Sequence, residues 1–497
     1  MAPPLSSKRG ERALWIVVYL GCASLLLAQI AYNFVDIDLW HQMALIRESL
    51  ASGHLLTHDV YSYAPTLNLV IDHEWGAGAV AFFAAKWAGG AGLVLIKYSV
   101  ALGVLLLAMS LAQLLGASEA SLGFLAPIAV GFLAFGLLPT LRAQAYSFLF
   151  SAVLLWSLEF DRRGTHRGLL VWLLLFPLWV NLHGGFVVGL AYVFLYAVEQ
   201  ALFRRRAWLA LLALCGMALE VFLNPYGLGY FRYMARALTM SRPRIPEWDP
   251  AWSLGATATV FFAVMVIIAI YAVARAGWRV PGVLLLPAAA AEALLHRKML
   301  PFFAIAWVCY VPVYARQTEP GKWVDHFAGK RKHFLVLAWT VLIVVCLVVA
   351  ARQRFWETRV PQGESDASYP VGATEYLAQQ HFHGNLMVPF RVGAYVSWKL
   401  YPAVKVSVDS RYEVAYPDQW VEQVFRFYEA KAGWKETLQA YSTDAVLVPE
   451  ASSVRPLLGA EGWIRTYCDA QFEIYARPES KLPIVDRTSE RFVGVFP

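Results

Sequence analysis

The chain has 497 residues, of which 59% are hydrophobic and only 15% are charged, and its formal net charge is +7. Soluble domains carry about 25% charged residues, so the composition excludes a soluble globular protein and indicates a polytopic membrane protein. The positive charge does not by itself indicate a nucleic-acid partner, because membrane proteins place Lys and Arg in cytoplasmic loops for topological reasons.

The first apolar run covers residues 13–34 and follows Lys8, Arg9 and Arg12, which places its start in the cytoplasm. A membrane-spanning helix needs about 20 apolar residues. Residues 75–89 form a shorter run rich in Gly and Ala, which favours a helix in the outer face of the membrane. The remaining predicted spans are 91–115, 119–138, 145–160, 168–182, 184–203, 207–223, 254–274, 280–294, 299–315 and 334–351.

This arrangement of about eleven spans keeps every basic loop on the cytoplasmic side. If residues 75–89 crossed the membrane, all the later basic loops would move to the wrong side. The basic loops are residues 161–167, 204–206, 275–279 and 316–333.

The same topology places the remaining polar groups of the apolar region on the outer face. Ionisable groups at membrane depth are costly and tend to mark function. Their convergence on one face predicts one site. The groups are Asp36, Asp38 and His41; His73, Glu74 and Trp75; Arg142 and Gln144; Asn181 and His183; Asn224 to Tyr226; Arg242 to Trp248; and His296, Arg297 and Lys298.

Each group also has a structural interpretation. Asp36 and Asp38 could only cap the helix that starts near Leu39, because Asp is a good N-cap residue. His73 and Glu74 could anchor the interface, and the pair Gly184-Gly185 could explain a tight turn around His183. Arg142 could reach phospholipid head groups.

Beyond Arg352 the sequence becomes more polar, and short apolar runs alternate with helical patterns, which indicates a small α/β domain. Within this domain, Asp409 and Arg411 either contact an acceptor or form a structural ion pair. The strands are expected at residues 385–390, 404–408, 445–448, 463–467 and 472–475, and the helices at 392–400, 419–430 and 434–441.

The sequence therefore predicts two regions. Residues 1–351 form a transmembrane catalytic module, in which residues 35–90 are the first outer loop with the acids and interfacial helices. Residues 352–497 form an extracytoplasmic domain.

Several short motifs occur in a fixed order along the chain. Together they resemble the bacterial C-type (GT-C) glycosyltransferase superfamily, in particular a group with an Asp-x-Asp-Leu-Trp-x-His pattern in the first outer loop. The matching segments are Asp36 to His41, where the histidine directly follows the tryptophan, His58 to Tyr63, His73 to Trp75, Arg142 to Gln144, Asn181 to Phe186, Asn224 to Gly227 and Arg297 to Phe302.

The resemblance implies a GT-C-like helical membrane protein that transfers a sugar, with inversion, from a polyprenyl-phosphate donor to a glycan, lipid or protein acceptor. It implies Asp36 as the general base and Asp38 as a partner, in an order that could be reversed. The pair could also hold Mg or Mn. The expected location is the bacterial cytoplasmic membrane, as part of cell-envelope synthesis. The substrate-binding candidates are His41, His73, Glu74, Arg142, Gln144, Asn181, His183, Arg244, Arg297 and Lys298.

Two other functions share these features. A transporter or flippase of lipid-linked glycans would also need many spans and a basic vestibule, although the sequence shows no convincing internal repeat. An oligosaccharide ligase could use the same site. The absence of P-loop, Rossmann and HExxH motifs from the sequence removes the usual support for ATP-driven transport and hydrolysis.

Overall fold

The computed structural model describes residues 5–361 and 368–497, with side chains from Arg12 onward. The side chains of Lys8 and Arg9, on which the predicted orientation of the first span rests, lie outside the described residues. The chain forms two compact units. Unit 1 contains the chain up to Asn33, Val94–Asn224 and Thr239–Glu357, and unit 2 contains Phe34–Leu93, Pro225–Leu238 and Thr358–Pro497.

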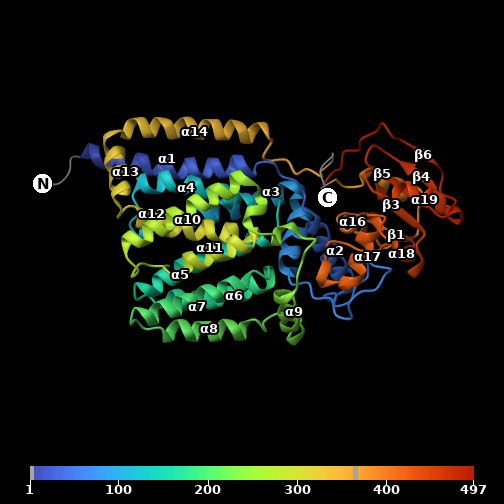
Figure 1. Ribbon diagram of the computed structural model, residues 1–497, viewed down its shortest axis with the longest axis horizontal. Coiled ribbons are helices and arrows are strands. Elements are labelled where there is room, and N and C mark those ends of the chain that lie inside the picture. Colours follow the sequence, from blue (N-terminus) through green and yellow to red (C-terminus); the bar gives the residue numbers. More distant parts are fainter. Residues whose placement is uncertain (1–4, 362–367) are drawn as a thin grey trace. The chain divides into compact units, whose positions relative to one another are not determined.

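Unit 1 is a bundle of helices that run side by side (Figure 1). Each of the eleven predicted spans overlaps one of its helices. The helices are α1 (Leu5–Ile30), the second part of α3 (Trp75–Leu114), α4 (Glu119–Phe135), α5 (Gln144–Arg162), α6 (Arg167–Leu182), α7 (Phe186–Leu202), α8 (Trp208–Glu220), α10 (Ala256–Ala276), α11 (Leu285–Leu295), α12 (Leu300–Ala315), α13 (Glu319–Lys330) and α14 (Lys332–Arg352), with short 3₁₀ turns η1 (Pro246–Trp248), η2 (Ala251–Leu254) and η3 (Arg297–Met299).

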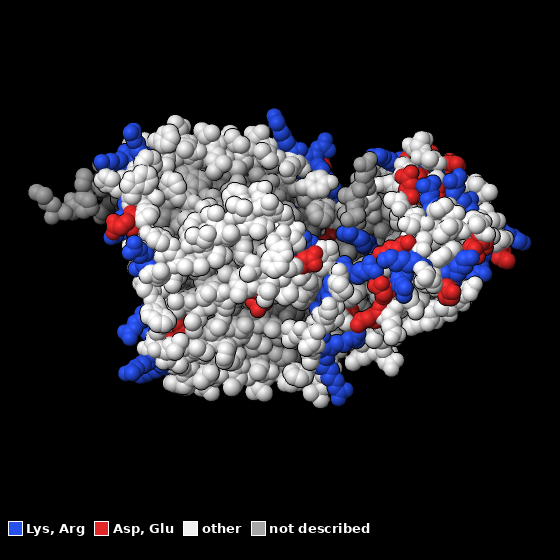
Figure 2. Space-filling model, viewed as in Figure 1, with Lys and Arg blue, Asp and Glu red and all other residues white. Residues whose placement is uncertain are grey.

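The apolar surface of unit 1 is that of a membrane protein. Every residue of α12 from Leu300 to Tyr314 is buried, so α12 is the centre of the bundle, whereas α14 buries only Cys346 and Ala350. The side of the bundle carries almost no charged residues (Figure 2). Five described helices are long and apolar enough to cross a membrane, and five shorter helices are also apolar. A helix that is apolar all round must be covered by protein or lipid.

The loops at one end of the bundle are tied to one another. Arg163 Nη2 donates to the Leu114 carbonyl at 2.9 Å, and the Gly282 N–H donates to Glu199 at 3.0 Å. Ser118 donates to Asp325, which also pairs with Arg316. The basic loops after α5, α7 and α12 therefore share one end, as predicted.

The opposite end gathers the other loops of unit 1. The buried Lys97 ammonium donates to the carbonyls of Ile30 and Leu138 at 2.8 Å each. Gln144 donates to the Lys298 carbonyl at 3.3 Å, and Asn181 donates to the Leu223 carbonyl at 2.8 Å. Successive spans thus alternate in direction, as the charge pattern of the sequence predicts.

Helix α3 is two helices joined at Gly89. This residue has φ 56° and ψ −147°, a backbone region that is essentially restricted to glycine. The break falls between the predicted interfacial run 75–89 and the predicted span 91–115. The short run and the span are therefore separate helical segments.

Unit 2 is built on a six-stranded mixed sheet with the order β2-β1-β3-β5-β4-β6. Strands β2, β1 and β3 are parallel, β3-β5-β4 are antiparallel, and β6 is parallel to β4. The strands are β1 (Gly384–Met387), β2 (Val404–Val406), β3 (Ala445–Pro449), β4 (Ile464–Cys468), β5 (Phe472–Ala476) and β6 (Val485–Asp486). The helices are α2 (Ile37–Ser52), α9 (Leu228–Thr239), α15 (Val371–Gln379), α16 (Gly393–Leu400), α17 (Asp418–Tyr428), α18 (Trp434–Ala440) and α19 (Arg455–Leu458), with 3₁₀ turns η4 (Tyr412–Val414), η5 (Gly459–Glu461) and η6 (Pro478–Ser480).

The C-terminal α/β domain is confirmed in its main elements. Each predicted strand and each predicted helix overlaps an observed one. Helix α15, the four-residue helix α19 and the two-residue strand β6 were not predicted, because none of them has a distinctive apolar pattern.

The first outer loop folds as part of this α/β domain. The Tyr63 N–H donates to the Val406 carbonyl at 3.1 Å, and the Val406 N–H donates to Tyr61 at 2.9 Å, so residues 61–63 extend the sheet beside β2. Ala64 and Val70 enter its hydrophobic core. The division between the units therefore differs from the single boundary expected near residue 351, because long-range backbone pairing joins residues 34–93 to the C-terminal region.

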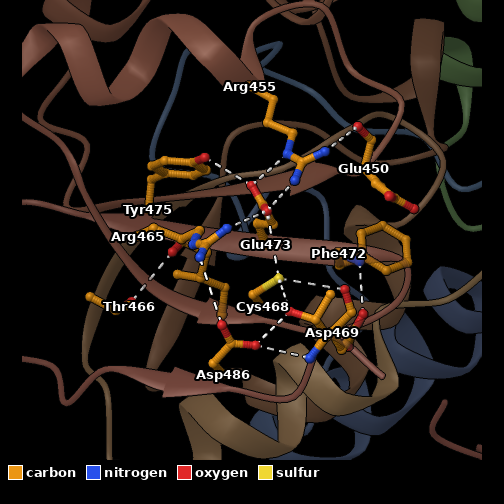
Figure 3. Close-up of polar contacts among 12 residues, drawn as sticks. Glu450, Arg455, Arg465, Thr466, Cys468, Asp469, Phe472, Glu473, Tyr475 and Asp486 are labelled. Atoms are coloured by element: carbon orange, nitrogen blue, oxygen red, sulfur yellow. Dashed lines mark hydrogen bonds and ion pairs between the residues drawn. The ribbon is translucent and has the colours of Figure 1, made fainter. Parts of the chain in front are cut away.

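A buried carboxylate lies at the pair of strands β4 and β5 (Figure 3). Glu473 on β5 accepts hydrogen bonds from Arg455 at 2.8 and 2.9 Å, from Arg465 at 3.2 Å and from the Tyr475 hydroxyl at 2.8 Å. These partners outweigh the burial of Glu473 and hold its pKa below the ordinary value. The network has enough partners to satisfy the carboxylate and is a structural feature of the β4–β5 pair.

Candidate functional site

The two predicted catalytic acids lie at the start of α2 in unit 2. Asp36 is the N-cap residue, and its Oδ1 accepts a hydrogen bond of 3.1 Å from the backbone N–H of Asp38. Asp36 therefore has the capping role that was its structural interpretation. The cap uses one carboxylate oxygen. Both acids stay partly exposed, with 30% of the Asp38 side chain accessible.

The tryptophan of the first-loop motif anchors α2 in the core. Trp40 is fully buried, and its ring lies 5.8 Å from Tyr369, 5.0 Å from Tyr395 and 5.4 Å from Phe496, measured between ring centroids. Such aromatic contacts stabilise a core beyond the area that they bury. Trp40 therefore fixes the start of α2, which carries both acids, in the core of unit 2.

The histidine of the motif contacts the C-terminal domain and not the acids. His41 Nδ1 lies 2.9 Å from Ser410 Oγ, whereas it lies 4.0 Å from the nearest Asp38 oxygen. Ser410 Oγ is also 3.3 Å from the Ile37 carbonyl at the start of α2. Burial lowers the pKa of His41 to about 4. The imidazole is therefore neutral near pH 7 and acts as a hydrogen-bonding group.

A buried ion cluster joins the first loop to the C-terminal domain. Arg411 Nη2 lies 2.6 Å from Asp59 and 2.7 Å from Asp409, and all three side chains are about 1% exposed. The Tyr416 hydroxyl accepts from Arg411 at 3.2 Å. Burial opposes ionisation of Asp409, but Arg411 outweighs it and holds the pKa of Asp409 below the ordinary value. The ion-pair interpretation of Asp409 and Arg411 thus describes their observed contacts.

A second acidic group in unit 2 surrounds His73. Glu74 accepts from Gln42 Nε2 at 2.5 Å and lies 3.5 Å from His73 Nε2. His73 Nδ1 lies 3.0 Å from the Tyr233 hydroxyl of α9. Burial lowers the pKa of His73, but Glu74 and Asp72 outweigh it, so the pKa is raised above the ordinary value. Asp72, which was not among the predicted site residues, is 6% exposed.

Unit 1 gathers a cationic cluster, defined here as Arg142, Arg242, Arg297 and Lys298. These four cations surround Glu247 and Trp248 in η1. Arg142 pairs with Glu247. The Lys298 ammonium lies 2.8 Å and the Arg242 guanidinium 4.5 Å from the centroid of the Trp248 ring. Burial opposes ionisation of Glu247. The positive charges of Arg142, Lys298 and Arg297 outweigh the effect of burial and hold the pKa of Glu247 below the ordinary value.

The cluster has an excess of positive charge and a buried donor. Its four cations lie around one carboxylate of η1, that of Glu247. Arg297 Nε is buried with no hydrogen-bond partner among the described residues. Planar guanidinium groups suit phosphate oxygens. An anion such as a phosphate would complete this arrangement.

Two predicted binding residues have structural contacts at the end of α6. Asn181 Nδ2 donates to the carbonyls of Pro177 and Leu223 at 2.8 Å each, so it joins α6 to α8. His183 Nδ1 accepts from the Gly185 N–H at 2.9 Å and lies 2.7 Å from Ser147 Oγ. These contacts match the tight-turn interpretation. Gln144 lies beside Lys298, and Arg244 is partly buried in the loop before η1.

Four residues of these clusters were not among the named substrate-binding candidates. Asp72 directly precedes His73 and Glu74, and Arg242, Glu247 and Trp248 lie in the predicted outer-face segment. The only signal for these residues in the sequence was their position, next to predicted site residues or within the predicted outer-face segment. Within the described residues, no group of three or more His, Cys, Asp or Glu side chains gathers as a metal site.

No family model and no curated protein sequence matches the chain. Solved structures share its fold, among them the following two. ArnT from Cupriavidus metallidurans, a crystal structure bound to undecaprenyl phosphate, is 11% identical with a TM-score of 0.50, and the match covers 93% of this chain and 98% of ArnT. The arabinofuranosyltransferase AftD from mycobacteria, a cryo-EM structure, is 14% identical with a TM-score of 0.51. That match covers 94% of this chain but only 42% of AftD. At these identities the likeness shows the fold alone.

Proposed function

We propose that this chain is a membrane glycosyltransferase, which moves a sugar from a polyprenyl-phosphate donor to an acceptor hydroxyl with inversion. The observation that carries the proposal is the fold shared with ArnT, a structure bound to undecaprenyl phosphate, over 93% of the chain. The fold of an arabinofuranosyltransferase supports the same reaction class. The proposed location is the bacterial cytoplasmic membrane, with the N-terminus inside and the C-terminal domain outside.

In the proposed step, the acceptor oxygen forms a bond to the anomeric carbon while the bond from that carbon to the phosphate oxygen breaks. The electron pair leaves with the polyprenyl phosphate, and the hydroxyl proton passes to a carboxylate. We assign Asp36 as this base and Asp38 as the group that orients the acceptor. Their partial exposure and the rigid attachment of α2 through Trp40 support this assignment.

The cationic cluster is the proposed phosphate-binding element. Negative charge grows on the phosphate as the sugar leaves, and fixed cations stabilise that charge without reorganising. Arg297 and Lys298 contribute side chains from η3, and Arg142 contributes a guanidinium already oriented by Glu247. The apolar bundle supplies the environment for the polyprenyl chain.

We extend the proposal to a divalent cation at the two acids. Mg or Mn accepts one or two carboxylates and completes its coordination with water and phosphate oxygens, and Asp36 and Asp38 fit that limited donor set. Asp36 Oδ1 also accepts the capping hydrogen bond from the Asp38 N–H. A bound ion would neutralise charge on the phosphate.

The decisive experiment follows polyprenyl lipids in membranes with and without the protein by mass spectrometry. Transfer would release polyprenyl phosphate and consume the lipid-linked sugar. Asp36→Asn keeps the capping oxygen but removes the base, so transfer is expected to fall at least about 100-fold. Asp38→Asn is assayed beside it and tests whether the two roles are reversed.

The same assay separates the other functions. A ligase would release the diphosphate, and a flippase would move the donor without consuming it. Full activity in both the Asp36→Asn and the Asp38→Asn variants would reject the proposed base. An unchanged set of polyprenyl lipids when the wild-type protein is absent would reject the transferase itself.

A further inference from the structure

We propose that Asp72, with His73, Glu74 and Tyr233, forms a site that binds the hydroxyl groups of a sugar ring. We call these four residues the Asp72 site. The inference deepens the proposed function, on which it rests, by placing carbohydrate recognition in unit 2, away from the acids of α2 in sequence. The sugar could belong to the acceptor or to the donor, and the experiment below distinguishes the two.

The first observation is the state of the Asp72 carboxylate. Its Oδ1 accepts from the Glu74 N–H at 3.0 Å, which caps the start of α3. Its Oδ2 is buried and has no hydrogen-bond partner among the described residues. A buried carboxylate oxygen without a donor is costly, and such groups in native proteins call for a specific explanation. A ligand hydroxyl supplies the missing donor.

The second observation is the composition of the surroundings. Tyr226 accepts from the Asp72 N–H at 3.2 Å, and the ring of Tyr233 lies 5.1 Å from that of His73 with an angle of 33° between the planes. Tyr230 is buried beside them, 6.4 Å from Tyr233. Binding sites for small molecules combine aromatic walls with a few fixed polar groups. Carboxylates among tyrosines match the alternating apolar and hydroxyl surfaces of a sugar.

The third observation is that the two residues after Asp72 are only partly buried. The side chains of His73 and Glu74 remain 20% and 16% exposed, whereas Asp72 is 6% exposed. Glu74 is held by Gln42 of α2. The group thus combines a buried acceptor with two partly exposed polar neighbours. A purely structural cap would need only the bond from Asp72 Oδ1.

The test measures the binding of methyl glycosides of hexoses and pentoses to the full-length protein in lipid nanodiscs by saturation-transfer NMR. Wild type is expected to bind at least one glycoside. Asp72→Asn retains the capping oxygen but replaces the second acceptor by a donor, so its Kd is expected to rise about 10-fold or more. Tyr233→Phe keeps the ring and removes the hydroxyl that lies 3.0 Å from His73 Nδ1, so it tests that polar contact independently and is expected to weaken binding less.

The matched control is Asp418→Asn, which makes the same chemical change at an exposed residue that pairs with Arg236 of α9 at 3.4 Å. Its Kd should equal that of wild type. Thermal unfolding establishes that each variant is folded. Unchanged binding by a folded Asp72→Asn variant would overturn the proposal, and so would absence of binding by wild type. If Asp72→Asn does not fold, the decisive comparison is Tyr233→Phe, and binding equal to that of wild type would overturn the proposal.

A competition arm identifies the source of the sugar. A polyprenyl-phosphate sugar that displaces the methyl glycoside assigns the site to the donor, and simultaneous binding assigns it to the acceptor. Release of polyprenyl phosphate is measured separately. A protein that binds glycosides but releases no polyprenyl phosphate would contradict the proposed function and leave the sugar site standing.

Discussion

The buried carboxyl group of Asp72 links stability to pH at the scale of one residue. Burial raises the pKa of Asp72 from 3.8 to about 6, although His73 and the Glu74 N–H oppose the shift. The folded protein therefore binds a proton more tightly than the unfolded chain. Between about pH 4 and pH 6 the stability contributed by this group falls as pH rises, because the unfolded chain ionises first.

Asp72→Asn is accordingly expected to raise the unfolding temperature at pH 7.5. The gain should shrink as pH falls from about 6 to 4, where wild type is protonated. Differential scanning fluorimetry at several pH values in detergent measures it. A gain that does not change with pH would contradict the assigned protonation. A stabilising substitution at a site that loses ligand binding is the pattern expected where function opposes stability.

Lys298 tests the phosphate-binding role of the cationic cluster. Its ammonium lies over the ring of Trp248, close enough to Glu247 to help lower the pKa of that carboxyl. A charge-assisted hydrogen bond contributes about 1.5–3 kcal/mol. Lys298→Ala is therefore expected to raise the KM for the lipid donor about 10- to 100-fold. The control is Lys322→Ala, an exposed lysine paired with Glu319, which should leave KM unchanged. An unchanged KM in Lys298→Ala would remove this residue from the donor site.

At the scale of an element, Gly89 decides whether α3 is one helix or two. Its backbone conformation excludes other L-residues on steric grounds, although a Cβ would meet no atom within 4 Å. Gly89→Ala is expected to lower the free energy of unfolding by about 1–3 kcal/mol through strain alone. The control is Gly329→Ala in α13, also in open space but with helical backbone, where the change is expected to be neutral or stabilising. Equal unfolding temperatures for the two variants would contradict this account.

The elements themselves were largely predictable from the sequence. Long apolar runs and basic loops specify spans without knowledge of tertiary contacts, which is why α10 and α14 were located closely. After residue 380, the local sequence pattern likewise predicted alternating strands and helices. The predictions missed elements whose pattern is short, as in β6, and they missed helix α13, which lies in the predicted basic loop 316–333.

The contacts of the site were much less predictable. His41 meets Ser410 across 369 residues of sequence, and Asp59 meets Arg411 in the same way. A single sequence offers no signal for such pairs, because each partner alone has an ordinary local pattern. In the sequence, Asp72 cannot be distinguished from an ordinary acidic residue that precedes a helix. Only its burial and its unpartnered oxygen distinguish it.

At the scale of the whole molecule, Arg411 holds the first loop to the C-terminal domain. Replacing it with Met leaves Asp59 and Asp409 buried without a cation, which is expected to cost about 3–5 kcal/mol. Hydrogen exchange in residues 34–93 should increase together with exchange in residues 404–416. The double variant Asp59→Asn with Arg411→Met removes one stranded charge, so it should recover part of the loss. Exchange that rises only in the C-terminal strands would contradict the shared unit.

The pairing of residues 61–63 with Val406 also sets the order of events during synthesis. The first loop leaves the ribosome more than 340 residues before its partner strand, and its side chains cannot reach their native contacts until residues 404–416 have followed. Non-local contacts of this kind form late, because the intervening chain must first be ordered. The spans are therefore inserted while Asp36 and Asp38 still lack their fixed support. The first loop therefore meets the membrane before its own fold is complete, and it reaches its native contacts only after residues 404–416 have been synthesised.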